Sequence, residues 1–180
     1  MSLPFEPVHA LDGRLPQGSA GEDRLVVLRR VAAVSVLAVP GAHIVAEKAL
    51  RAEDGLGIRF VSPGEWLAVQ PGGDAEGLRL RLAVSLDAIA HVIDQSDGRV
   101  HLRLEGPNAR TILSKGIGID FRGLDMGGSA GTLCGHIPVL LARTGAHRFE
   151  LAVMRSFAES LLHDLLAMGR EFGLSADFEG

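Results

Sequence analysis

The chain has 180 residues, of which 47% are hydrophobic, and its formal net charge is −4 with no basic or acidic block. Nucleic acid is not expected as a partner, because phosphate binding needs a basic face and base stacking needs more than the 4% of aromatic residues found here. The single cysteine excludes a disulfide framework. No apolar run approaches the ~18 residues of a membrane span, and the N-terminus lacks a signal-peptide pattern, so a cytoplasmic protein is expected.

Residues 1–23 are rich in proline and glycine and are predicted to form an extended arm outside the core. Such an arm lies on a partner or a neighbouring lobe, or it is a mobile terminus. The next segments alternate between β-rich runs and helical patterns. We predict strands at 25–28, 31–39, 58–61, 66–69, 88–93, 100–104, 133–143 and 149–153, and helices at 42–54, 74–85, 107–115 and 156–172.

The stretch from Asp94 to Arg99, Asp-Gln-Ser-Asp-Gly-Arg, is predicted to be a hairpin tip. Apolar sequence flanks it on both sides, and the following run alternates between apolar and polar residues, as in a half-buried strand. Asp97 and Gly98 would supply the turn, because glycine tolerates the positive φ that a tight hairpin needs.

The C-terminal part of the chain is predicted to contain a loop, a strand and a long helix. Residues 117–131 are glycine-rich and expected to be a loop, and the strand at 133–143 is interrupted by Pro138, which suits an edge or a bulge. Ser156 and Glu159 form a capping-box pattern at the start of the last helix. The buried stripe of that helix is predicted to be Phe157, Leu161, Leu165 and Met168.

The order of the predicted elements repeats. Residues 24–87 and 88–178 each read as β-α-β-β-α, with Gly41 matching Gly106 and Trp66 matching Phe149. This order predicts an α+β fold of two related units in one compact domain, with antiparallel sheets covered by helices.

Three stretches of the chain have residues that could form a chemical site. Ser96 lies between Asp94 and Asp97, but such residues in a turn usually bond their own backbone. Cys134 and His136 have the spacing of two metal ligands on one strand, yet no second pair of ligands stands nearby, so no metal is expected. The Gly127–Gly131 segment lacks the setting of a phosphate-binding loop and is expected to be flexible.

Two further sites are candidates for function because of their charged residues alone. Asp120 and Asp125 are expected to be solvated or paired with Arg122. Arg155 at a strand-to-helix junction could clamp a carboxylate, but a lobe–lobe salt bridge, a partner contact or a carbonyl contact is favoured.

Taken together, these motifs resemble the gamma subunit of heterotetrameric sarcosine oxidase over roughly residues 25–173. The matching stretches are Asp94 to Arg99, Leu104-x-Gly106-Pro107-x-Ala109-Arg110, Leu113 to Gly116, Ile119-Asp120, Phe149 to Val153 and Arg155 to Ala158. The resemblance marks Asp94, Gln95, Ser96, Asp97, Arg155, Ser156 and Phe157 as signature or interface residues. It implies a subunit without catalytic, cofactor-binding or metal-binding residues of its own.

That subunit is in turn similar to the folate-binding domain of aminomethyltransferases, which carries a carboxylate in the hairpin after the Gly-Pro helix. Here the same region, residues 133–139, contains no carboxylate. The resemblance therefore implies partnership with alpha, beta and delta subunits that hold FAD, FMN, NAD and tetrahydrofolate. The whole assembly would demethylate sarcosine to glycine with release of hydrogen peroxide and transfer of the one-carbon unit to tetrahydrofolate. The alternative is a free-standing folate-binding or aminomethyltransferase-like module.

Overall fold

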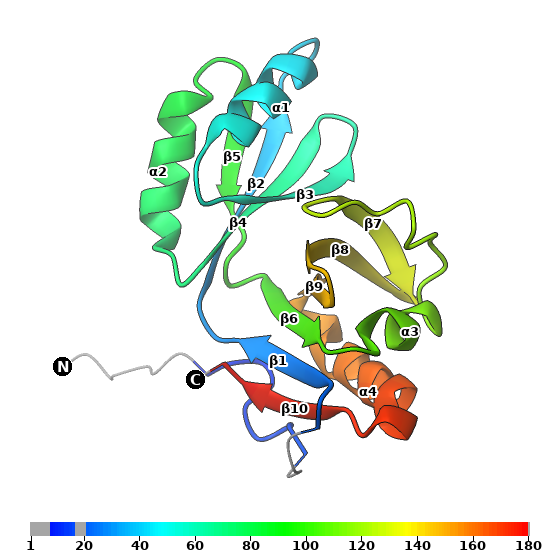
Figure 1. Cartoon of the computed structure of the whole chain (residues 1–180). Helices are drawn as coiled ribbons and strands as arrows, with labels where there is room; N and C mark the ends of the chain where they lie inside the picture. Colours follow the sequence, from blue (N-terminus) through cyan, green and yellow to red (C-terminus); the bar gives the residue numbers. More distant parts are fainter. Residues whose placement is uncertain (1–7, 17–20, 180) are drawn as a thin grey trace, which may run out of the picture.

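A computed structural model describes residues 8–16 and 21–179 and shows two antiparallel sheets with helices on their outer faces (Figure 1). The strands are β1 (Arg24–Leu28), β2 (Val31–Ala38), β3 (Gly57–Ser62), β4 (Glu65–Pro71), β5 (Ala90–Asp94), β6 (Arg99–Glu105), β7 (Ser129–Cys134), β8 (Ile137–Gly145), β9 (Arg148–Met154) and β10 (Ser175–Phe178). The helices are α1 (His43–Ala52), α2 (Ala75–Ser85), α3 (Ala109–Ser114) and α4 (Ala158–Gly169), with 3-10 turns η1 (Arg155–Phe157) and η2 (Arg170–Phe172) on either side of α4.

The larger sheet has six strands in the order β10-β1-β6-β9-β8-β7. Its neighbours run antiparallel except β1 and β10, which are parallel. Val100, Leu102 and Leu104 of β6 pack on the same side as buried residues of α3 and α4, in the larger hydrophobic core. The alternation read from the sequence therefore gives the correct buried face of this strand.

The smaller sheet has four strands in the order β3-β4-β2-β5, and α1 and α2 cover one face of it. Its core contains Trp66 of β4 together with Leu50 of α1 and Leu82 of α2. The other face of this sheet turns toward the six-stranded sheet, where Ala33, Leu67, Val69, Leu140 and Ala152 form a third cluster. The fold is therefore four-layered, with helices outside and two sheets in the middle, and the predicted α+β class with helix-covered antiparallel sheets is confirmed.

A common order of elements recurs along the chain. β2-α1-β3-β4-α2 is followed by β6-α3-β8-β9-α4, with β7 added before β8. Gly41 and Gly106, which precede the first helix of each series, both have positive φ, and Trp66 and Phe149 are both buried. The sheets exchange strands across residue 87, because β1 joins the larger sheet and β5 the smaller one. The division into units at 24–87 and 88–178 remains a prediction.

The segment 94–99 does not form the predicted hairpin. β5 pairs with β2, whereas β6 pairs with β1 and β9, so the segment is a crossover from one sheet to the other. Gly98 also lacks the positive φ expected of a hairpin glycine. Local sequence shows where a strand ends, but tertiary packing decides which strands pair, and here the chain changes sheets.

The last helix also begins differently from the prediction. α4 starts at Ala158 after the 3-10 turn η1, and Phe157 rather than Ser156 holds the N-cap position, without a side-chain cap bond. Phe157 is 44% exposed and is not part of the buried stripe, whereas Leu161 and Leu165 are fully buried as predicted. A 3-10 turn does not keep the α-helical phase, so residues before Ala158 fall off the buried face.

Three further predictions need correction. The region 133–143 is not one strand, because β7 and β8 turn at Gly135, and the expected loop 117–131 already includes the start of β7. Leu11 of the predicted arm is fully buried in the larger core, held by a turn in which the Asp12 carboxylate accepts a hydrogen bond from the His9 backbone N–H. Residues 1–7 and 17–20 of the arm lie outside the described residues. Strand β10 was not predicted.

Candidate functional site

The first signature segment, Asp94 to Asp97, lies in the crossover and forms hydrogen bonds to β2. The Ser96 hydroxyl donates to Asp94 Oδ1 at 2.7 Å and accepts from the Ala33 backbone N–H at 3.0 Å. The backbone N–H of Ser96 also donates to Asp94 Oδ1, and that of Gln95 donates to the Ala33 carbonyl at 2.7 Å. Ser96 therefore acts as a side-chain tether between strands, in line with the backbone-bonding role expected for it.

The second signature segment meets the first at one backbone contact. The N–H of Arg155 donates to the Gly98 carbonyl at 2.9 Å, which connects the crossover to η1. The Arg155 guanidinium donates to the Val8 carbonyl at 2.7 Å, and this is one of the contacts anticipated from the sequence. Ser156 and Phe157 are exposed and form no hydrogen bond to the crossover among the described residues.

Ser96, Asp97 and Arg155 line the same hollow, which measures about 420 Å³. The structure thus brings together part of the two signature segments, although they lie far apart in the sequence. The Gln95 backbone takes part in the tether to β2, and Ser156 and Phe157 lie outside this hollow.

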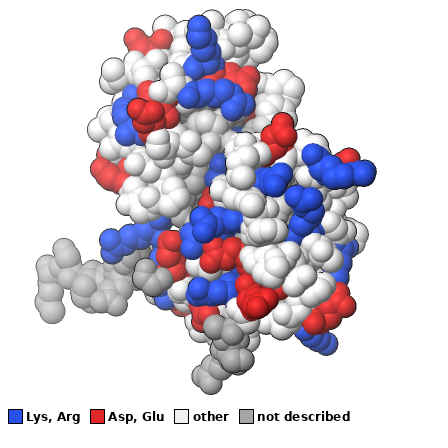
Figure 2. All heavy atoms as spheres, viewed as in Figure 1, with Lys and Arg blue, Asp and Glu red and all other residues white. Residues whose placement is uncertain are grey.

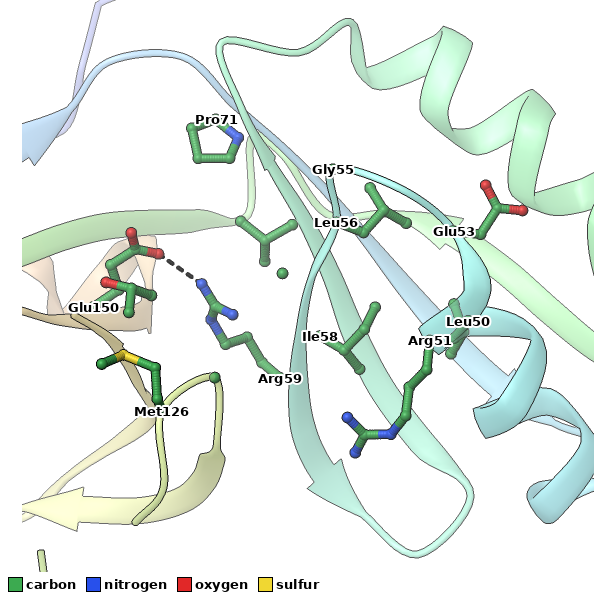
Figure 3. Close-up of a pocket in the computed structure, with 14 residues that line it drawn as sticks. Leu50, Arg51, Glu53, Gly55, Leu56, Ile58, Arg59, Pro71, Met126 and Glu150 are labelled. Atoms are coloured by element: carbon green, nitrogen blue, oxygen red, sulfur yellow. Dashed lines mark hydrogen bonds and ion pairs between the residues drawn. The ribbon is translucent and has the colours of Figure 1, made fainter. Parts of the chain in front are cut away.

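A second hollow, of about 530 Å³, lies at the junction of the two sheets (Figure 3). Residues from α1, β3 and β4 line one side, and Met126, Thr144 and Glu150 line the other. Arg59 of β3 reaches across to Glu150 of β9 in an ion pair of 2.6 Å, the dashed line in Figure 3. Their side chains are 7% and 12% exposed, so this pair is a buried link between the sheets.

The ion pair decides what this second hollow can do chemically. Glu150 is bound to a guanidinium and is therefore poorly placed to accept a proton from a substrate. Glu53, the other carboxylate of the wall, pairs with Arg81 at 3.3 Å. Both acids on this wall are thus committed to internal contacts.

His101 of β6 is the most strongly perturbed histidine among the described residues. It is only 4% exposed, and burial lowers its pKa to about 3, with the charges of Arg59 and Arg99 acting in the same direction. Its Nε2 is buried without a hydrogen-bond partner among the described residues. The imidazole is therefore neutral at physiological pH and lines the hollow that Ser96 and Arg155 share.

The other residues singled out in the sequence have structural roles. Cys134 is buried, and burial, aided by the charge of Asp164, raises the pKa of its thiol to about 11, while His136 is exposed in the β7–β8 turn. Across residues 8–16 and 21–179, no group of three His, Cys, Asp or Glu side chains is placed to hold a metal ion. Asp120 pairs with Arg122 at 3.1 Å, as anticipated.

Sequence reasoning assigned no individual role to Arg59, Glu150, Arg99 or His101. A usable signal was present, because Arg59 and Glu150 each interrupt an apolar strand with a charge of opposite sign. Such charges inside strands are rarely left buried unless they are paired. The pairing partner itself depends on how the two sheets stack, which the sequence does not reveal.

The surface offers no sign of a single-charge interface on the face seen in Figure 2. Acidic and basic side chains are interspersed there, with no continuous area of one sign. No helix among the described residues is long and apolar enough to cross a membrane.

Comparison with known proteins gives a consistent result. The family model described as "Sarcosine oxidase, gamma subunit family" matches residues 25–168. The sarcosine oxidase subunit gamma of an Arthrobacter species is 32% identical over 95% of this chain and 92% of its own length, and that of Corynebacterium sp. strain P-1 is 31% identical over the same shares.

Solved structures agree. A chain of the heterotetrameric sarcosine oxidase from Corynebacterium sp. U-96, in complex with pyrrole 2-carboxylate, superposes with a TM-score of 0.75 at 27% identity, covering 87% of this chain and 89% of that one. The glycine cleavage system aminomethyltransferase T from Bartonella henselae gives a TM-score of 0.64 at 18% identity, covering 89% of this chain and 48% of that one, which is a likeness of fold.

Proposed function

The chain belongs to the sarcosine oxidase gamma subunit family, and we propose that it is a non-catalytic subunit of a heterotetrameric sarcosine oxidase. In this proposal the complex oxidatively demethylates sarcosine to glycine, releases hydrogen peroxide and passes the one-carbon unit to tetrahydrofolate. Alpha, beta and delta subunits carry FAD, FMN, NAD and tetrahydrofolate, and the assembly works in the cytoplasm. The gamma chain supplies packing surface.

The observation that carries the non-catalytic role is the internal use of one carboxylate, of Glu150, and one hydroxyl, of Ser96, that face the hollows. Glu150 is held by Arg59, and Ser96 is held by Asp94 and by the backbone of β2. A general base or a nucleophile needs a free lone pair or an activating neighbour aimed at the substrate. These side chains instead connect strands, which is the role of a scaffold.

The signature residues Asp94 to Asp97 and Arg155 to Phe157 are proposed to shape the surface that meets a large subunit. Phe157 and the neighbouring Met154 are 44% and 43% exposed, and apolar side chains of this size are enriched at the centre of protein interfaces. The tether at Ser96 and the contact between Arg155 and Gly98 hold this surface in place.

One experiment tests the interface. The large subunits are co-expressed with the wild-type chain, with Phe157→Ser or with Ile44→Ser, and the complex is quantified after affinity purification. Ile44 is the control because it is an exposed apolar residue, at 71%, on α1, which covers the smaller sheet. Phe157→Ser should lower the yield of complex while the turnover per assembled complex is kept. Full assembly of the Phe157→Ser chain would rule out this interface, and assembled complex with lost turnover would rule out the non-catalytic role.

A free-standing folate-binding module is the second candidate, favoured by the likeness of fold to aminomethyltransferase T and by the hollow of about 530 Å³ between the sheets. It predicts saturable binding of tetrahydrofolate to the purified chain, and this binding should be weakened by substitutions of residues that line the hollow. The non-catalytic subunit predicts no saturable binding in the same calorimetric titration, so the two candidates give opposite results.

A further inference from the structure

The hollow shared by Ser96 and Arg155 has a cationic wall. Arg29 and Arg30 from the β1–β2 connection, Arg99 at the start of β6 and Arg155 in η1 all line it, against the single carboxylate of Asp97 among the described residues. We call this feature the arginine hollow, defined by these four arginines with His101 and Ser96. Four guanidinium groups facing one carboxylate leave an excess of positive charge.

The four arginines of the arginine hollow differ in whether their guanidinium groups already have a partner. Arg29 pairs with Asp12 at 3.2 Å, and Arg155 donates to the Val8 carbonyl. Arg30 and Arg99 form no ion pair within 4.0 Å with any described residue. Two guanidinium groups therefore keep their donors available for a ligand.

The floor of the arginine hollow contains two buried nitrogen atoms without hydrogen-bond partners. His101 is 4% exposed and its Nε2 has no hydrogen-bond partner in the described part of the chain. The Nε of Arg99, also buried, lacks a partner in the same residues. Buried polar atoms in folded proteins are nearly always hydrogen-bonded, so two side chains that line this hollow keep unused hydrogen-bonding capacity.

We propose that the arginine hollow binds a small free oxyanion, a carboxylate or a phosphate. Arg30 and Arg99 hold its oxygens by paired N–H donors, and His101 lies at the floor of the hollow. The planar fork of a guanidinium matches both oxyanions, and the volume of about 420 Å³ suits a ligand of a few heavy atoms up to a small dicarboxylate. This inference goes beyond the subunit role. It requires the arginine hollow to stay open to solvent in the complex, beside the proposed contact residues Met154 and Phe157, which do not line it.

The test uses the full chain and, separately, the assembled complex. Inorganic phosphate and succinate are titrated by calorimetry at low ionic strength, and the His101 imidazole signals are followed by NMR in the full chain. Saturable binding of at least one of the two anions is expected, with a shift of the His101 signals at saturation. The anion that saturates the site at the lower concentration, phosphate or succinate, identifies the oxyanion class.

Variants locate the site. Arg30→Ala and Arg99→Gln should each weaken binding at least about tenfold, which is the loss of one charge-assisted hydrogen bond of about 1.4 kcal/mol. Arg122→Ala removes an exposed arginine of another loop and should leave binding unchanged. Arg30 is exposed, so its variant is expected to fold, and circular dichroism checks this.

Three results would overturn the proposal. The first is no saturable binding of either anion, and the second is binding that Arg30→Ala and Arg99→Gln leave unchanged. The third is binding to the free chain that disappears in the assembled complex, because a group of another subunit would then occupy the hollow. None of these results bears on whether the chain assembles, so failure here is distinct from failure of the subunit role.

Discussion

Arg59 and Glu150 stand 91 positions apart in the chain and meet at 2.6 Å between the two sheets. One comes from the edge strand of the smaller sheet and the other from the middle of the larger sheet. Because both side chains are buried, neither charge is solvated by water in compensation for a lost partner. This ion pair therefore links the two sheets beside the apolar cluster that packs between them.

Removing one partner of this pair should be costly. Glu150→Ala leaves the Arg59 charge buried and unpaired, and we expect it to lower the free energy of unfolding by about 3–5 kcal/mol in urea titrations. The double variant Arg59→Met, Glu150→Leu should be much less destabilised, because apolar residues replace both charges. The exposed pair gives the control, since Arg122→Ala should leave the free energy of unfolding nearly unchanged. Equal losses for the single and double variants would contradict this account.

The Ser96 tether should be worth about as much as one or two hydrogen bonds. Ser96→Ala removes the acceptor for the Ala33 N–H, and we expect a loss of about 1–2 kcal/mol in the free energy of unfolding. Asp97→Asn is the matched variant, because the Asp97 side chain makes no hydrogen bond with the described residues. A larger effect at Asp97 than at Ser96 would show that the crossover is held differently.

Gly106 tolerates no side chain at the junction of β6 and α3. Its φ is +136°, and an added Cβ would lie 2.6 Å from the Asp23 Cα. Asp23 cannot yield easily, since its carboxylate accepts hydrogen bonds from Asn108 at 2.9 Å. Gly106→Ala should therefore destabilise the fold by at least about 2 kcal/mol, measured by thermal unfolding. Gly118→Ala, with open space around it, should be nearly neutral, and similar losses for both would refute the steric argument.

The lowered pKa of His101 predicts that the free energy of unfolding depends on pH. Its pKa falls from 6.5 in the unfolded chain to about 3 in the folded protein. Below pH 6.5 the unfolded chain takes up a proton that the folded protein does not, so the free energy of unfolding falls as the pH drops from 6.5 toward 3, by on the order of 4 kcal/mol in total.

Denaturant titrations between pH 4 and pH 7 check this prediction. His101→Gln should flatten the slope over that range, and His163→Gln, which changes an exposed histidine of α4, should not. An unchanged slope in His101→Gln would mean that other groups cause the acid sensitivity.

Local patterns predicted most of the secondary structure and the class of the fold. The alternation of Val100, Leu102 and Leu104 identified the buried face of β6, and Leu161 and Leu165 identified that of α4. The errors fall where long-range contacts decide. The crossover at 94–99 looks like a hairpin because its two strands flank a polar turn, and only the stacking of two sheets separates them.

The sites were harder to predict than the fold. Ser96 and Arg155 were singled out, and their meeting through Gly98 depends on η1 docking beside the crossover. Arg59 and His101 gave weak signals, since one polar residue in an apolar strand is equally compatible with exposure. Their burial follows from the face-to-face packing of the sheets, which places Arg59 beside Glu150, 91 positions further along the chain.

Native mass spectrometry of the co-expressed subunits tests the central claim most directly. We predict a single assembly whose mass contains one copy each of the alpha, beta and delta subunits and one copy of this chain. The purified chain alone should produce no hydrogen peroxide from sarcosine. A complex of full turnover that lacks this chain, or a chain that stays outside every assembly, would contradict its role as a gamma subunit.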